Sequence, residues 1–265
     1  MINQSLLKPK TIFRPSRDER VGLFLLTFVL LIMTSHIHAN DPFDCFTAAY
    51  REHGGSKYMI NEEIVQSTHV LQAAYLAKLC GAPEDVIIGL LFHDIGQVID
   101  PANVGNTALL HAVHDEKGAQ WLADNGFPAN VIDWVRFHTL AKVVLCMEDP
   151  DYYTHLSEAS KESYQIQRSK YLNEEGQTSL HYFNQHQCRA DFLRQRKCDD
   201  MAKITDFETT DSLEDYREMT FRVIAGDGAS AARDDWRENI DSLHSLMCQN
   251  RSAFEEAIRQ GGFFK

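Results

Sequence analysis

The sequence predicts an all-α fold. After residue 41, apolar residues recur at helical spacing, and the alternation of apolar and polar residues that marks a half-buried strand is nearly absent. The chain has 265 residues, of which 44% are hydrophobic, so it is long enough for a substantial core. No linker, repeat or low-complexity tract interrupts residues 41–265, and we therefore expect a single domain there.

Residues 1–40 differ in composition from the rest of the chain. Basic residues between Lys8 and Arg20 precede an uncharged apolar run, Val21 to Thr34, which is short for a membrane span of about 20 residues. This order is typical of a secretory signal, and an uncleaved membrane anchor is the alternative. We expect a secreted or membrane-anchored protein if this segment is a true signal, and a cytoplasmic one otherwise. Membrane contact is expected only through residues 21–34.

Helix bounds follow from stop signals in the first half of the chain. A helix over Asn61–Leu79 starts with acidic residues, which suit the positive end of the helix dipole, and stops at Cys80 to Pro83. An apolar helix over Glu84–Phe92 follows. Gly126 to Pro128 separates a helix over Asp115–Asn125 from one over Ala129–His138.

The second half is also expected to be helical. The pair Asp149-Pro150 breaks the chain, because the residue before a proline disfavours helical backbone angles. After it we expect helices over Tyr152–Gln167, Ser179–Thr205, Leu213–Ile224 and Asp234–Arg259.

The charge and the cysteines narrow the classes of partner. The formal net charge of −12 argues against nucleic acid and against an anionic membrane surface as the main partner. It allows a small anionic substrate, because a local basic pocket can lie inside an acidic protein. The six cysteines form no C-x-x-C pair and no pattern typical of a disulfide scaffold.

The most informative residues are His93 and Asp94, which follow an apolar helix and precede Ile95-Gly96. A carboxylate can bridge two metal ions through its two oxygens, and a histidine supplies a neutral nitrogen beside it. Such a pair alone is weak evidence, because an aspartate that caps a helix next to a core histidine would look the same.

Other segments offer partners for this pair. His69, His114, His138 and Asp199 each lie on a different expected helix, as ligands do when a metal site is assembled in a helical core. A set of nitrogen and carboxylate ligands without thiols favours iron, manganese or zinc over copper(I). His111 competes with His114, and Asp200 competes with Asp199. Gly118-Ala119 and Lys203 favour His114 and Asp199, respectively.

At these residues the chain resembles the HD-domain superfamily, and within it the mixed-valent di-iron oxygenases. That branch includes enzymes that cleave the carbon–phosphorus bond of 2-amino-1-hydroxyethylphosphonate and, more remotely, myo-inositol oxygenase. The similarity runs from about Tyr58 to Lys203. Its motifs are Gln66–His69, Phe92–Gly96, His114–Ala119, His138–Lys142, Leu156–Ser160 and Arg196–Lys203.

The resemblance implies an HD-domain helical bundle over residues 41–265 with two iron ions, Fe(II) and Fe(III), and dioxygen as co-substrate. His69, His93 and Asp199 would hold one iron, His114 and His138 the other, and Asp94 would bridge them. The implied reaction is oxidative cleavage of a carbon–phosphorus bond in a hydroxy-alkylphosphonate.

The resemblance also implies a group of residues that bind the substrate. Lys142, Ser160, Ser163, Gln167 and Arg196 would bind the phosphonate, which suits a lysine charge, an arginine fork and neutral donors.

The resemblance implies catalytic roles for Asp94, Lys142 and Glu62. Glu62 would contact the substrate amine or order a lid. The chain departs from the family at Gln97, where a histidine is usual. It also departs at Met59, the place of a tyrosine that covers the iron; Tyr58, one residue earlier, is the candidate replacement. Gln97 and Tyr58 are counted among the substrate-binding candidates.

Two other functions remain open on the residues alone. A metal-dependent phosphohydrolase would use the same ligands to activate water against a phosphate ester or nucleotide. A protein that binds metal without turnover would also need these ligands.

Overall fold

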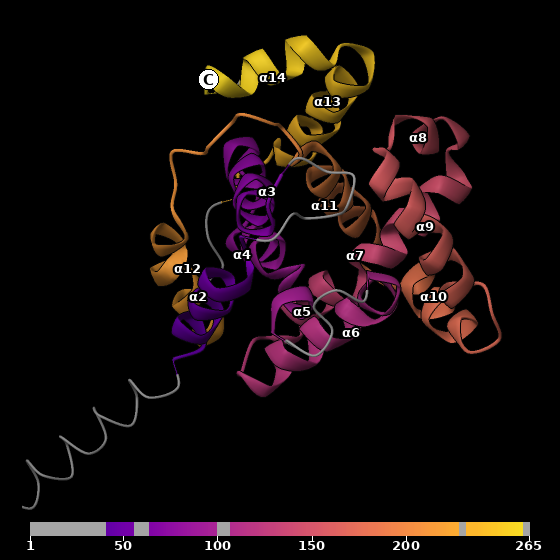
Figure 1. The fold of residues 1–265 in the computed structure, drawn as a ribbon, viewed down its shortest axis with the longest axis horizontal. Helices are drawn as coiled ribbons and strands as arrows, with labels where there is room; N and C mark the ends of the chain where they lie inside the picture. The colour runs from indigo at the N-terminus through magenta and orange to yellow at the C-terminus, as the bar shows by residue number, and fades with distance from the viewer. Residues whose placement is uncertain (1–40, 56–63, 100–106, 228–231, 262–265) are drawn as a thin grey trace, which may run out of the picture. The chain divides into compact units, whose positions relative to one another are not determined.

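The computed structural model describes residues 41–55, 64–99, 107–227 and 232–261, with no side chains described at 107–110. Every regular element in these ranges is a helix, so the predicted all-α class is confirmed (Figure 1). The expected signal or anchor in residues 1–40 lies outside them. The described residues from Cys45 onward belong to one compact unit. In the part of the chain described, no helix is both long and apolar enough to span a bilayer.

The first half of the chain contains α2 (Pro42–His53), α3 (Gln66–Cys80), α4 (Glu84–Phe92), α5 (Ile95–Val98), α6 (Thr107–Asp124) and α7 (Ala129–Glu148). The second half contains α8 (Pro150–His155), α9 (Glu158–Tyr171), α10 (Gly176–Gln185), α11 (Arg189–Met201), the 3-10 helix η2 (Leu213–Tyr216), α12 (Arg217–Ala225), α13 (Trp236–Gln249) and α14 (Arg251–Arg259).

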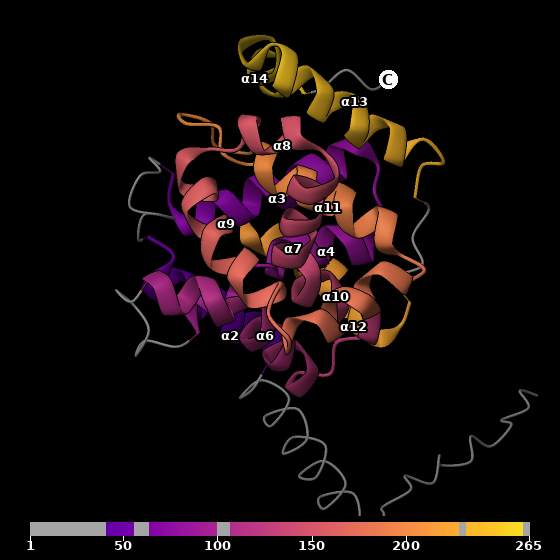
Figure 2. The same cartoon turned by 90° about the vertical axis from the view of Figure 1, so that its right-hand side faces the viewer.

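Helix α7 is the centre of the bundle. It packs against α4, α6, α9 and α11, and Figure 2 shows these helices around it. Its apolar residues occur on all sides, among them the buried Val131, Trp134 and Leu140, as expected of a helix enclosed by others. Helix α3 packs against α4 and α11, so α3, α4, α7 and α11 share one core.

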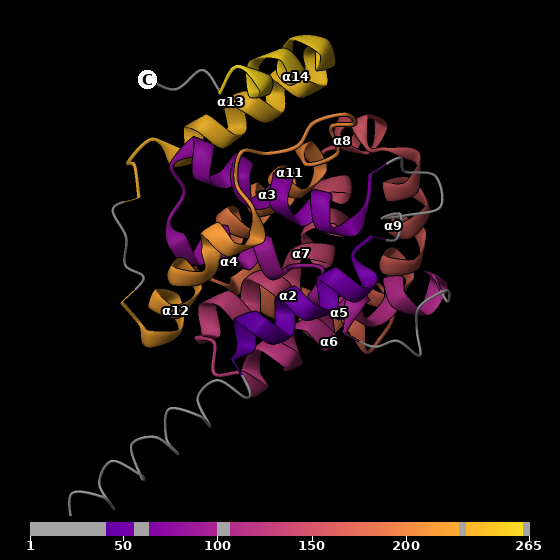
Figure 3. The ribbon, with the colours of Figure 1, turned by 60° about the vertical axis from the view of Figure 1, so that its left-hand side comes forward.

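Outer helices cover this core. Helix α13 packs against α11 and α3, α14 packs against α13, and α12 packs against α4 (Figure 3). Asn239 on α13 donates a hydrogen bond to the Cys80 carbonyl at 3.1 Å, which satisfies a carbonyl at the end of α3.

Several predicted bounds hold. Helix α4 spans Glu84–Phe92 as expected. Helix α3 ends at Cys80, because Gly81 takes the left-handed backbone (φ 80°) and its N–H caps the carbonyls of Ala77 and Lys78. The predicted start of this helix at Asn61 lies outside the described residues, and Ile64 and Val65 are not helical.

Two predicted helices were too short. Helix α7 continues beyond His138 to Glu148, because nothing before Asp149-Pro150 interrupts its hydrogen bonds. Helix α6 begins at Thr107, not at Asp115. His114 and His138 therefore lie inside their helices, where the backbone is held on both sides, and not at helix ends.

Three other predictions of single helices were wrong, because a local break divides each one. Ser157 caps α9 through its hydroxyl, which separates α8 from α9. Extended backbone at His186 separates α10 from α11 and lets Phe183 stack on Phe192 at 5.7 Å between ring centroids. Asn250 is extended and its side chain caps α14, which separates α13 from α14. Helices α2 and α5 were not predicted.

Glycine brings α5 into direct contact with α6. A Cβ on Gly96 would lie 2.0 Å from the His114 carbonyl oxygen and 2.9 Å from the Gly118 backbone nitrogen. Backbone atoms cannot rotate away from such a contact, so only glycine fits here. The close approach places the segment that follows Asp94 directly against the turn of α6 that carries His114.

We therefore expect Gly96→Ala to lower the free energy of unfolding by about 3 kcal/mol, the upper range for overpacking. Urea denaturation of the metal-free protein measures this. Gly55→Ala is the matched control, because a Cβ there meets nothing within 4 Å. Equal stability of the two variants would contradict the tight α5–α6 contact.

Candidate metal centre and anion pocket

The six predicted ligand side chains lie together in the core, each at most 2% exposed. They come from separate helices: His69 from α3, His114 from α6, His138 from α7 and Asp199 from α11. His93 and Asp94 occupy the junction between α4 and α5. The packing of α3, α4, α6, α7 and α11 thus brings together residues up to 130 positions apart.

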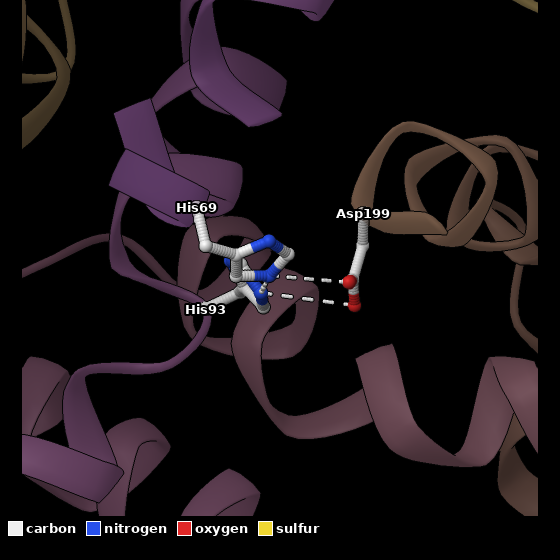
Figure 4. A group of neighbouring side chains, drawn as sticks. All are labelled: His69, His93 and Asp199. Carbon is white, nitrogen blue, oxygen red and sulfur yellow. Dashed lines mark hydrogen bonds and ion pairs between the residues drawn. The ribbon is translucent and has the colours of Figure 1, made fainter. Parts of the chain in front are cut away.

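The first group consists of His69, His93 and Asp199 (Figure 4). The two Nε2 atoms are 3.1 Å apart. Asp199 Oδ1 lies 3.3 Å from His69 Nε2, and Asp199 Oδ2 lies 3.7 Å from His93 Nε2. The rings and the carboxylate point toward one another from opposite sides, so the group could hold a metal ion.

The second group consists of Asp94, His114 and His138. Its two Nε2 atoms are 3.0 Å apart. Asp94 Oδ1 lies 3.4 Å from that of His114 and 3.6 Å from that of His138. Each group therefore consists of two imidazoles and one carboxylate.

Asp94 connects the two groups. Its Oδ1 faces His114 and His138, while its Oδ2 lies 3.6 Å from His69 Nε2 and 3.2 Å from His93 Nε2. One carboxylate thus presents one oxygen to each histidine pair, which is the arrangement of a bridging ligand.

Hydrogen bonds fix the tautomers of three histidines. The Nδ1 atoms of His69, His93 and His138 lie 2.6–2.7 Å from backbone carbonyl oxygens. A carbonyl only accepts, so each Nδ1 carries the hydrogen and each Nε2 can present its lone pair to the centre. Metal-binding histidines are oriented in this way by the partner of their other ring nitrogen.

The carboxylates of Asp94 and Asp199 favour a positive charge beside His93. Although burial by itself lowers the pKa of His93, Asp94 and Asp199 raise this pKa to about 9, so a proton is held there when no metal is bound. For Asp94, burial acts to raise the pKa of the carboxyl, but His93 and the other histidines hold it well below its usual range. Among the described residues, Asp94 Oδ2 and Asp199 Oδ1 accept no hydrogen bond.

The residues present fit a pair of metal ions. Adjacent ligands on an octahedral ion, at roughly 2.1 Å from it, are about 3 Å apart, close to the separations in both groups. Burial lowers the pKa of His114 to about 4, and His138 adds to this effect, so His114 is in the neutral, metal-binding form at neutral pH. Two histidines with one carboxylate are the ligand set typical of non-haem iron oxygenases.

The competing residues lie elsewhere. The His111 ring centroid is 6.4 Å from that of His114, and His111 belongs to neither group. Asp200 accepts hydrogen bonds from Arg196 and from the Tyr152 hydroxyl. The structure thus brings His114 and Asp199, and not their neighbours, to the centre.

The predicted phosphonate-binding residues are buried polar side chains, and two of them, Lys142 and Ser163, are hydrogen-bonded to each other. The members of this set, each at most 3% exposed, are Lys142, Ser160, Ser163, Gln167 and Arg196. Lys142 Nζ donates to Ser163 Oγ at 2.6 Å and approaches the Ser160 carbonyl at 3.5 Å. Gln167 Oε1 has no hydrogen-bond partner among the described residues. We name this set the anion pocket.

Arg196 connects the anion pocket to the metal centre. It donates to Asp199 Oδ2 at 2.5 Å, and it also donates to both oxygens of Asp200. Burial acts to raise the pKa of the Asp199 carboxyl, but the Arg196 guanidinium and His93 hold it well below its usual range. Much of the Arg196 charge is therefore already balanced by two carboxylates.

Sequence reasoning used Lys203 only to choose between Asp199 and Asp200, yet Lys203 also reaches the anion pocket. Its Nζ donates to Ser160 Oγ at 2.5 Å. Burial lowers the pKa of Lys142 well below its usual range, and nearby Arg196 and Lys203 lower it further. Such crowding of cations in a buried place favours a bound anion. In the sequence, Arg196, Asp199 and Lys203 follow one another at intervals of three and four residues, and this spacing could have indicated that Lys203 lies near the other two.

Gln97 contacts the metal centre directly. Its Nε2 donates to Asp94 Oδ1 at 2.7 Å, and Gln66 Nε2 donates to Gln97 Oε1 at 2.6 Å. In this arrangement Gln97 orients the carboxylate that connects the groups. Tyr58, a substrate-binding candidate, and Glu62, a catalytic candidate, lie outside the described residues.

Comparisons with known proteins identify the family of this chain. The family model for the HD domain matches residues 67–177. A hydroxymethylphosphonate dioxygenase of Gimesia maris is 33% identical over 204 residues, which cover 76% of this chain and 96% of that protein. The chain belongs to the HD-domain family.

Two further relatives of this HD-domain protein extend the comparison. The [1-hydroxy-2-(trimethylamino)ethyl]phosphonate dioxygenase (glycine-betaine-forming) of Leisingera caerulea is 32% identical over 59% of this chain and 78% of that protein. An uncharacterised protein of Acanthamoeba polyphaga mimivirus is 28% identical over 66% of this chain and 78% of that protein.

The geometry yields a test of the second group. We expect His114→Ala to lose the metal ion held with His138, because one of two imidazole ligands is gone, whereas His111→Ala keeps it. Anaerobic titration with ferrous iron, followed by counting the ions per chain, measures this. Equal losses in the two variants would contradict the placement of His114.

Proposed function

We propose that this HD-domain protein is a di-iron oxygenase that cleaves the carbon–phosphorus bond of a small hydroxylated alkylphosphonate and releases phosphate. The observation that carries the proposal is Asp94, which presents one oxygen to each histidine pair, beside a buried pocket of cations. The names of two relatives, both phosphonate dioxygenases, support the oxidative reaction.

The ligand set supports iron. Each group offers two imidazoles and one carboxylate, with no thiol, and such a set leaves coordination positions for substrate and dioxygen. When bound, a pair of iron ions would supply the oxidation by dioxygen, which the protein's side chains cannot perform themselves.

The proposed reaction balances with one dioxygen per substrate. The Leisingera enzyme is named for forming glycine betaine, so the carbon that carries both hydroxyl and phosphorus becomes a carboxylate. That carbon loses its bonds to hydrogen and phosphorus and gains one oxygen atom. The phosphonate gains the other oxygen atom and leaves as phosphate, and the hydrogen leaves as a proton. No further reductant is needed.

The anion pocket supplies orientation. Lys142 with Ser160 and Ser163 can bind the phosphonate oxygens, and the contact of Arg196 with Asp199 sets the pocket beside the first group. Holding the anion there brings the hydroxylated carbon to the metal centre in a fixed pose. The burial of the pocket residues excludes water, which strengthens the contact between the anion and the lysine charge.

The two named relatives share the hydroxylated carbon and the phosphonate but differ in the rest of the substrate. One acts on hydroxymethylphosphonate, without nitrogen, and the other on a trimethylammonium compound. We therefore propose the shared part, a 1-hydroxyalkylphosphonate, as the substrate class of this chain.

We expect the protein, reconstituted anaerobically with ferrous iron and then exposed to air, to consume dioxygen and release phosphate from hydroxymethylphosphonate or its trimethylaminoethyl relative. An oxygen electrode and a phosphate assay measure the two in parallel. Cleavage of p-nitrophenyl phosphate without oxygen, together with inertness toward both phosphonates, would favour a phosphohydrolase and refute the proposal.

A second expectation concerns Lys142. Lys142→Met removes the buried ammonium group that would donate to the phosphonate. We expect the KM for the phosphonate to rise by about 10- to 100-fold, since a hydrogen bond to a charged group contributes roughly 1.5–3 kcal/mol. The iron content should stay unchanged. Lys161→Met is the control, because Lys161 lies nearby on α9 but pairs with the exposed Glu158. Loss of iron in Lys142→Met would contradict the role assigned to it.

A further inference from the structure

Asp115 is a buried carboxylate that neither the metal centre nor the anion pocket uses. It lies on α6 and is fully buried. Lys170 Nζ donates to its two oxygens at 2.8 and 2.9 Å, and the hydroxyls of Thr139 and Tyr171 both donate to Oδ2. Thr139 Oγ1 and Tyr171 OH are themselves 2.8 Å apart. We name these four residues the Asp115 network.

The network lies directly behind the second group of candidate ligands. Asp115 follows His114 on α6, and Thr139 follows His138 on α7. In a helix, neighbouring residues share one rigid stretch of hydrogen-bonded backbone. A hydrogen bond between Thr139 and Asp115 therefore fixes how the two turns that carry His114 and His138 face each other.

Helix α9 closes the network and also carries part of the anion pocket. Its buried residues include Ser160, Ser163, Gln167 and Tyr171, which follow one another at intervals of three or four residues and so form one stripe. The first three belong to the anion pocket, and Tyr171 binds Asp115. Lys170, the residue before Tyr171, supplies the balancing charge.

Stable packing of the helices does not by itself require a buried carboxylate at position 115. A buried carboxylate is costly unless paired, and replacing such a pair by apolar residues is often neutral or stabilising. Here the carboxylate accepts from two hydroxyls and one ammonium, from two helices other than its own. Hydrogen bonds are directional, so this network fixes the relative position of α6, α7 and α9 more strictly than apolar contacts would.

We propose that Asp115 is a positioning residue, which holds His114 and His138 at metal-binding separation through Thr139, Tyr171 and Lys170. The inference rests on the proposed two-metal centre. It predicts that weakening the network lowers the affinity of the second group for its ion and leaves the first group, His69, His93 and Asp199, unaffected.

The test is anaerobic titration of the metal-free protein with ferrous iron, in wild type, Asp115→Asn and Lys170→Met. We expect two ions per chain in all three, with the second ion bound about 10-fold more weakly in the variants, at the low end of the effect of residues that orient ligands. Lys170→Arg keeps the charge and should restore the affinity. The melting temperature of each metal-free protein is measured in parallel.

Lys197→Met is the matched control. Lys197 pairs with Asp241 at 2.6 Å and is 23% exposed, compared with 25% for Lys170, but its partner lies on α13, a helix that carries no candidate ligand. This variant should bind both ions like the wild type.

The results separate this inference from the proposal on which it rests. If Asp115→Asn and Lys170→Met bind both ions with wild-type affinity while their metal-free melting temperatures fall, the network is structural only and the inference is overturned. If the wild type itself binds fewer than two ions, the two-metal centre fails and the inference fails with it.

Discussion

The structure depends on one buried carboxylate, Asp94, placed between two pairs of histidines. A buried carboxylate is costly unless it is paired. Here the Nε2 atoms of four histidines face Asp94, and the raised pKa of His93, about 9, provides the positive charge when no metal is bound. The surrounding helices hold Asp94 in this position. Helix α4 delivers Asp94 at its end, and Gly96 lets the chain turn directly against α6, next to His114.

The metal centre and the anion pocket form one continuous electrostatic system. Arg196 binds Asp199 on one side and Asp200 on the other, while Lys142 and Lys203 converge on Ser160 and Ser163. A change of charge at either place therefore acts on the other through Arg196. Metal ions would offset the carboxylates of the centre, and a phosphonate would offset the lysines.

Helix ends were predicted correctly where the local sequence contains residues that favour a helix end, and were missed elsewhere. Helix α4 and the end of α3 were predicted because Gly81 and Pro83 stand close together, and this pair is a strong local signal for the end of one helix and the start of the next. The breaks at His186 and Asn250 were not predicted, because neither residue by itself prevents a helix. At His186 the chain turns so that the aromatic residues of α10 and α11 can pack together.

The sequence by itself determined the helical class, the ligand types and the residues that compete for the centre. The motifs around His69, His93, Asp94, His114, His138 and Asp199 carried the resemblance to the HD-domain family. The resemblance implied that Asp94 would bridge the two groups, and the tertiary structure supplied its distances to the four histidines. Only the tertiary structure gave Lys203 a contact with the anion pocket and joined Asp115 to α9. The reason is physical: spacing along a chain defines neighbours within one helix, whereas contacts between helices depend on how they pack.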